Sequence, residues 1–175
     1  TAVLGGNTLE VGGAADIDGI LTVAADSLII AGASDFDGTL NITTGIIDTE
    51  GGFDAENGTI DFTDAGKLQL AGAVTHLGAL SDDKGIVIYD GGNQDIFADT
   101  YFDLIASGTA TKELGGVVVV EQDLTIGAGV TLDVTGDDFA LSIKRTFANA
   151  GTFDGKAGTV TFDGTGHQQL TSNGS

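Results

Sequence analysis

The sequence predicts an all-β fold in which the chain winds into a parallel β-solenoid, with about 19–20 residues in each coil. Three observations predict it. The chain repeats itself over a long interval, and a shorter unit of 19 residues recurs inside that interval. Short alternations of apolar and polar residues fill each unit, and clusters of glycine, asparagine and aspartate separate them. This combination is typical of short strands joined by tight turns.

The long repeat is most evident in two segments that lie 100 positions apart without a gap. Residues 51–70 read GGFDAENGTIDFTDAGKLQL and residues 151–170 read GTFDGKAGTVTFDGTGHQQL, with nine of twenty positions identical. Upstream, LEVGG at 9–13 resembles KELGG at 112–116. A long internal repeat indicates an array of similar structural units, which is typical of stalks, filaments and binding surfaces.

The repeat divides the chain into three parts. We predict that residues 1–8 are the tail of a preceding repeat, 9–111 a full repeat of about 100 residues and 112–175 part of a second, in one continuous solenoid. We expect such a chain to belong to a longer array. Neither end shows the pattern of an amphipathic capping helix, so we also expect the ends to meet more solenoid, in the same chain or in another copy.

The short repeat places similar residues 19 positions apart. Asp16-Ile17-Asp18-Gly19 is followed by Asp35-Phe36-Asp37-Gly38, and Asp54 lies 19 residues after Asp35. In the second copy Leu124, Ile143 and Phe162 are also 19 apart. The strand alternations place apolar residues two apart on one face; examples are Leu28/Ile30, Leu68/Leu70, Leu132/Val134 and Val160/Phe162.

Tandem β-sandwiches of the immunoglobulin or cadherin type are the alternative fold. A repeat of about 100 residues is the size of such a module, and Asp-x-Asp pairs would suit calcium sites at module junctions. A 19-residue period has no reason to exist in a sandwich, however, and the chain contains no proline for sandwich loops. These two facts favour the solenoid.

Composition narrows the classes of partner. The chain carries six Lys+Arg against 26 Asp+Glu, a formal net charge of −20. Nucleic acids and anionic membranes bind basic surfaces, so we expect neither as a partner. No apolar run approaches the ~18 residues that span a bilayer, which predicts no membrane insertion. The absence of cysteine excludes disulfides, thiol catalysis and thiolate metal sites.

The phrases QDLTIGAGVTLDV and GTFDGKAGTVTFDGTGHQQL resemble repeats of large secreted bacterial β-helical surface proteins, the filamentous-haemagglutinin-like adhesins. The similarity covers 112–170 well and 9–70 more loosely. It implies a right-handed parallel β-helix in an extracellular protein of the bacterial cell surface. The matching positions are mostly turn and core residues, so the resemblance assigns no functional residue.

Calcium is the cofactor that the sequence suggests. Asp16, Asp18, Asp35, Asp37 and Asp54 are the candidate ligands, the first four in tight turns that end in glycine. Stacked coils would bring Asp16, Asp35 and Asp54 within ~5–10 Å of one another, where like charges repel unless a cation or a proton intervenes. The alternative is that they are solvated turn residues that hydrogen-bond locally. The two histidines, His76 and His167, are isolated in sequence, which is more typical of surface residues than of metal ligands.

The sequence as a whole predicts a structural or adhesive segment of an extracellular surface or filament protein. We expect it to act as a stiff acidic rod that associates with copies of itself, with host-cell or matrix carbohydrate or protein as further partners. We expect no enzyme, since no pair of acids is distinguished from the rest and Arg145 is the only arginine. A calcium-dependent carbohydrate- or cell-binding module is the alternative. An exposed aromatic patch would favour it, and none is evident in the sequence; Tyr89 and Tyr101 are the residues to examine. A β-helical polysaccharide lyase or hydrolase is a minor alternative.

Overall fold

The computed structural model describes residues 2–3, 7–81, 83–134 and 139–172, and within these the chain is all-β. Residues 1 and 4–6 of the predicted tail lie outside the described residues. The chain forms a parallel β-solenoid of about eight turns, so the fold class predicted from the sequence is confirmed. The described residues contain no helix, and hence none of a length and hydropathy that would cross a membrane.

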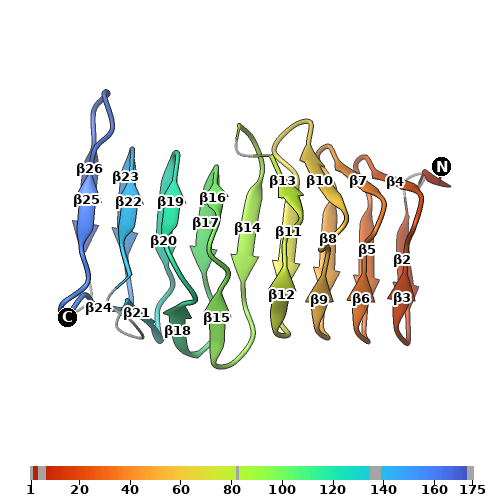
Figure 1. The fold of residues 1–175 in the computed structure, drawn as a ribbon, viewed down its shortest axis with the longest axis horizontal. Helices are drawn as coiled ribbons and strands as arrows, with labels where there is room; N and C mark the ends of the chain where they lie inside the picture. The colour runs from red at the N-terminus through yellow and green to blue at the C-terminus, as the bar shows by residue number, and fades with distance from the viewer. Residues whose placement is uncertain (1, 4–6, 82, 135–138, 173–175) are drawn as a thin grey trace. The chain divides into compact units, whose positions relative to one another are not determined.

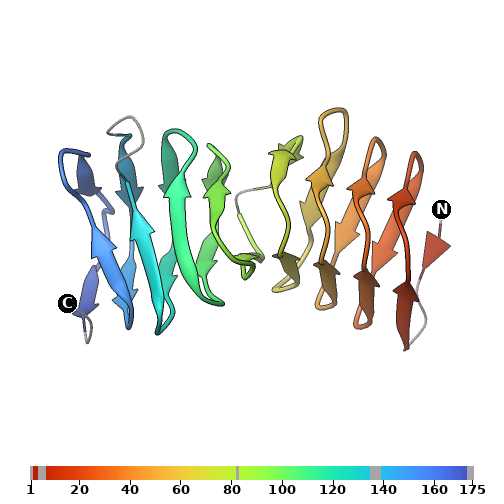
Figure 2. The same ribbon diagram turned by 90° about the horizontal axis from the view of Figure 1, so that it is seen from below.

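The coils divide into two compact units, Thr1–Val87 and Ile88–Ser175. In each unit every third strand along the chain joins the same sheet, so a coil passes through three strands. Figures 1 and 2 show the coils side by side within each unit. The strands of the first unit are β1 (Ala2–Val3), β2 (Thr8–Val11), β3 (Ala15–Asp16), β4 (Ile20–Val23), β5 (Ser27–Ile30), β6 (Ser34–Asp35), β7 (Thr39–Ile42), β8 (Ile46–Thr49), β9 (Phe53–Asp54), β10 (Thr59–Phe62), β11 (Lys67–Leu70), β12 (Val74–His76) and β13 (Ala79–Leu80). Strand β14 (Ile86–Tyr89) spans the boundary between the units.

The second unit repeats this order of three strands per coil. Its strands are β15 (Gln94–Ile96), β16 (Thr100–Tyr101), β17 (Asp103–Ala106), β18 (Ala110–Leu114), β19 (Val118–Val120), β20 (Asp123–Ile126), β21 (Val130–Asp133), β22 (Leu141–Ile143), β23 (Thr146–Asn149), β24 (Thr152–Asp154), β25 (Val160–Phe162) and β26 (Gln169–Ser172).

Each unit has three faces of parallel strands. In the first unit they are β2-β5-β8-β11, β3-β6-β9-β12 and β1-β4-β7-β10-β13; in the second they are β17-β20-β23-β26, β15-β18-β21-β24 and β16-β19-β22-β25. Every strand pairing described within a unit is parallel. A β-sandwich is built from antiparallel sheets, so the tandem-sandwich alternative is wrong.

The core of each unit consists of columns of apolar side chains, one from each coil. Leu28, Ile47 and Leu68 occupy the same register position of successive strands and are at most 2 % exposed. Their outward neighbours are half-buried, as the alternation in the sequence predicts. The apolar columns therefore run the length of each unit. In the same way, an outward-pointing residue that recurs once per coil forms a row on the surface.

The 19-residue offset joins every strand pair from β1 to β9, but most of the later pairs have a different offset. Asp16 pairs with Asp35, Asp35 with Asp54, and Ile143 with Phe162, each 19 apart as predicted. Leu124, however, pairs with Phe147 and not with Ile143, so that prediction is wrong. Seven residues connect β21 to β22, where three connect β18 to β19. The offset between register partners accordingly grows from 20 at β18 and β21 to 23 at β19 and β22.

Candidate functional site

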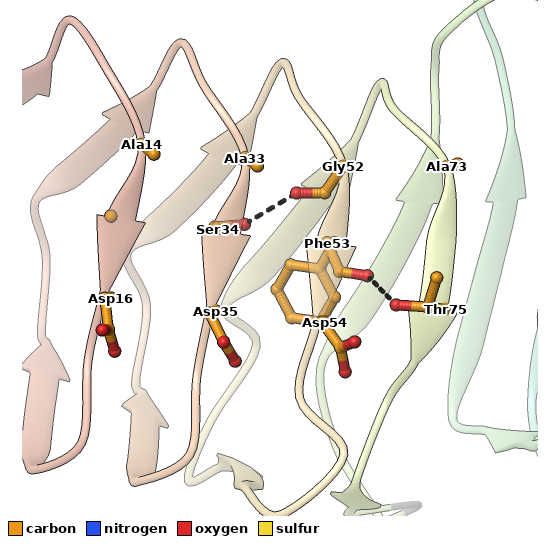
Figure 3. A pocket seen from close by; sticks show the side chains of 11 residues that line it. Ala14, Asp16, Ala33, Ser34, Asp35, Gly52, Phe53, Asp54, Ala73 and Thr75 are labelled. Carbon is orange, nitrogen blue, oxygen red and sulfur yellow. Dashed lines mark hydrogen bonds between the residues drawn. The ribbon is translucent and has the colours of Figure 1, made fainter.

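One row of carboxylates runs along the narrow face β3-β6-β9-β12 of the first unit. Asp16, Asp35 and Asp54 are register partners in successive strands, and Figure 3 shows their side chains pointing outward on the same side. Parallel strands lie about 4.8 Å apart, so the row presents one carboxylate per coil at that spacing. The sequence predicted this row correctly from the 19-residue offset.

A shallow groove of about 460 Å³ lies beside this row. A second row, of small residues, forms its other side because side chains of this size leave the face open; these residues are Ala14, Ala33, Gly52 and Ala73 (Figure 3). The ring of Phe53 is buried beneath it and contacts Phe36, with ring centroids 5.4 Å apart. The groove thus pairs an apolar strip with a line of negative charge.

The pKa values of Asp35 and Asp54 shift in opposite directions. Desolvation raises the pKa of Asp35, and the charges of Asp37, Asp16, Asp54 and Asp18 raise it further. Asp54 behaves in the opposite way. Partial burial raises its pKa, but the nearby Thr75 hydroxyl, the backbone N–H of Glu56 and His76 outweigh this, so the pKa of Asp54 is lowered overall.

A histidine ends the carboxylate row. His76 is the register partner of Asp54 across a β-bulge in β12, and its Nδ1 lies 3.1 Å from Asp54 Oδ1. Both side chains are about two-fifths exposed, so this pair contributes little stability. The sequence analysis missed this partnership because the offset is already 21 at Phe53 and Val74, and the bulge raises it to 22 at Asp54 and His76. A search that allowed the coil length to vary by three residues would have found it.

The other two calcium candidates lie two residues after Asp16 and Asp35 in the same coils. Asp18 and Asp37 are exposed, and Asn57 donates a hydrogen bond from Nδ2 to Asp37 Oδ1 at 3.2 Å. Within the described residues no three His, Asp or Glu side chains converge closely enough to enclose a metal ion. A calcium ion held here would therefore rely on carboxylates of adjacent coils together with water or a second molecule, and calcium binding stays a prediction.

The second unit contains a buried lysine and two buried tyrosines. The ammonium of Lys112 is fully buried and donates to the carbonyl oxygens of Gly91 and Gly92, each at 2.6 Å, and to Gln94 Oε1 at 2.7 Å. Tyr89 and Tyr101 are also fully buried. They cannot form an exposed aromatic platform for a sugar, so they give the binding-module alternative no support.

The chain matches no family model, and no curated protein or solved structure is significantly similar to it. The fold therefore rests on the register of the strands, and the function on the surfaces described above.

Proposed function

We propose that this chain is a structural and adhesive segment of an extracellular bacterial surface or filament protein, and that it associates with copies of itself. The observation that carries the proposal is the register of Asp16, Asp35 and Asp54, which gives three successive coils the same outward group. A surface that repeats with the coil suits contacts that also repeat, as in a lateral array. The resemblance of the repeats to filamentous-haemagglutinin-like adhesins supports the same function.

The physical basis of the structural role is the direction of the backbone hydrogen bonds. In a parallel solenoid these bonds run from coil to coil, and apolar columns such as Leu28, Ile47 and Leu68 run beside them. Bending a unit would strain many of these contacts at once, so each unit is stiff. A net charge of −20 keeps copies apart until cations screen or bridge the acidic rows.

A calcium-dependent carbohydrate- or cell-binding module is the second candidate, and the groove beside the carboxylate row favours it. Calcium bound by adjacent carboxylates could present open coordination positions to the hydroxyl groups of a ligand lying along the small-residue strip. Both candidates need the same acidic row. They differ in whether calcium joins two copies of the chain or a copy and a sugar.

Sedimentation velocity in calcium, in magnesium and in a chelator tests the proposal. We expect calcium to promote association of the natural chain, and the triple variant Asp16→Asn, Asp35→Asn, Asp54→Asn to abolish that effect. The matched control removes three exposed acids outside this row, with Glu50→Gln, Asp64→Asn and Asp83→Asn. We expect it to associate like the natural chain.

Two results would decide against this function. Identical sedimentation in calcium and in chelator would refute association through bridging cations. Calcium binding by a chain that stays monomeric, lost in the triple variant, would favour the carbohydrate- or cell-binding module instead.

A further inference from the structure

The second unit contains a polar hollow of about 660 Å³ at one corner of three successive coils. The connections β19–β20, β22–β23 and β25–β26 form it, and they contribute Glu121–Gln122, Lys144–Arg145 and the loop 163–167. Parallel pairing of β20 with β23 and of β23 with β26 stacks these connections above one another. The hollow therefore belongs to the fold of this unit.

The loop that forms one wall is held firmly in place. Gly164 lies so close to the backbone of Lys144 that a Cβ atom would be 1.7 Å from its carbonyl oxygen. With its amide oriented to satisfy its neighbours, Gln168 accepts hydrogen bonds from the backbone N–H of Asp163 at 3.2 Å and of Gly164 at 2.7 Å. Ser142 donates to Asp163 Oδ1 at 2.7 Å. This wall is thus organised without a ligand.

Basic groups gather at this hollow in a chain that has few of them. Two of the six lysine and arginine residues and one of the two histidines line it: Lys144, Arg145 and His167. Lys144 forms an ion pair with Glu121. Arg145 has only long contacts, 3.9 Å to Asp123 Oδ2 and 3.4 Å to Gln122 Oε1, and its side chain is 60 % exposed. Its guanidinium can still take a carboxylate in a bidentate pair.

The acids in the same lining define the ligand further. A polyanion would be repelled by Glu121, Asp163 and the net charge of −20. A ligand with a single anionic group and several hydroxyl groups would suit this lining. Its anionic group would contact the basic side chains, and its hydroxyl groups would donate hydrogen bonds to the carboxylates and the amide. The lining includes no large apolar side chain, so the ligand is hydrophilic on all sides.

We propose that this hollow binds a carboxylated sugar residue, with the carboxylate against Arg145 and hydroxyl groups against Asp163 and Gln122. This site goes beyond the mechanical role and gives the adhesive role a ligand class. It lies in the second unit, whereas the calcium test concerns the first, so either proposal can fail alone.

Protein-observed NMR titration of the whole chain with methyl glucuronide and methyl glucoside tests the site, since the two sugars differ in their carboxylate. We expect the glucuronide to bind with a Kd of about 1–10 mM and to shift the signals of residues 121–123, 144–145 and 163–167, while the glucoside does not bind. Arg145→Gln should weaken binding about tenfold. Lys84→Gln removes one exposed positive charge in the first unit and should change nothing.

Three outcomes would overturn the proposal. The first is that neither sugar binds, and the second is that Arg145→Gln, folded by circular dichroism, binds the glucuronide like Lys84→Gln. The third is that sulfate or a triglutamate peptide competes as well as the glucuronide and Asp163→Asn has no effect, because the hollow would then recognise an anion and not a sugar.

Discussion

Lys112 shows how one residue changes a column of the core. In β18 it takes the inward position that Leu132 and Phe153 take in the next two coils, and Gln94 precedes it in register. Burial lowers the pKa of its ammonium, and the nearby charge of Asp90 opposes this. Three oxygen acceptors surround the ammonium. Two of these acceptors belong to the turn before β15, so the burial of the ammonium depends on the conformation of that turn.

Replacing Lys112 with methionine should destabilise the second unit by about 2–4 kcal/mol, because the buried Gln94 side chain and the carbonyl groups of Gly91 and Gly92 lose a charged donor. Lys84→Met changes an exposed lysine in the same way and should have little effect. The chain has no tryptophan, and both its tyrosines are buried in the second unit. Tyrosine fluorescence during urea unfolding therefore reports on that unit. An unchanged midpoint in Lys112→Met would contradict the prediction.

The two tyrosines form a closed set of hydrogen bonds with Phe97. Tyr101 donates from its hydroxyl to the carbonyl oxygen of Phe97 at 2.6 Å, and the N–H of Phe97 donates to the Tyr89 hydroxyl at 3.1 Å. The hydroxyls are 3.0 Å apart. Since Tyr101 has already used its proton, Tyr89 donates to Tyr101. Burial raises the pKa of Tyr89 to about 12 and that of Tyr101 well above its usual 10.0.

These shifts predict a loss of stability in alkali. Above pH 10 the unfolded chain releases both tyrosine protons while the folded chain keeps them, so the free energy of unfolding falls as the pH rises from about 10 towards 12. Tyr101→Phe removes one of these groups and should flatten the fall, even though it lowers stability at every pH. Circular dichroism of urea unfolding measures the slopes. Tyrosinate absorbance appearing near pH 10 in the folded chain would contradict this.

At the scale of elements, the corners of the coils depend on glycine. Gly13, Gly32, Gly51 and Gly72 occupy the turn that precedes each narrow strand of the first unit. A Cβ atom on Gly51 would lie 2.4 Å from the backbone of Gly32, and one on Gly72 would lie 2.0 Å from the Gly51 oxygen. Successive coils therefore approach as closely as their backbones allow. Gly151, the repeat partner of Gly51, is equally confined by the carbonyl oxygen of Val130 at 2.3 Å.

This packing gives a matched pair of substitutions in one row. Gly51→Ala should destabilise the first unit by about 2 kcal/mol or more, because backbone atoms cannot yield as a flexible side chain does. Gly13→Ala should be neutral or slightly stabilising, since nothing lies within 4 Å of its Cβ position and alanine restricts the unfolded chain. Thermal unfolding followed by circular dichroism compares the two. Equal effects would contradict the prediction. They would indicate that glycine is needed here for its backbone conformational freedom and not for the short distance between adjacent coils.

At the scale of the whole molecule, charge acts against folding. A net charge of −20 on 175 residues repels itself in the compact state. We expect sodium chloride to raise the midpoint of thermal unfolding by screening this repulsion. The increase should shrink as the pH approaches the isoelectric point near 4.1, where the net charge vanishes. A midpoint that salt does not change at neutral pH would contradict the prediction.

The sequence by itself determined the fold class and the carboxylate row. The columns and rows repeat with the coil, and side chains that alternate two apart must face alternately inward and outward. The segments 51–70 and 151–170 accordingly form the same succession of strands, β9–β11 and β24–β26. LEVGG and KELGG do not correspond in this way, because the first lies in β2 and the second in β18, on different faces of the coil. The boundaries 9–111 and 112–175 stay a prediction.

Only the tertiary structure decided which side chains of adjacent coils become partners, because this depends on how far each connection displaces the next strand. The bulge in β12 brings His76 to Asp54, and the longer connection after β21 sets Phe147 beside Leu124. The burial of Lys112 needs the carbonyl groups of one particular turn. Such details follow from backbone paths, which residue periodicity does not encode, whereas the fold class follows from the periodicity itself.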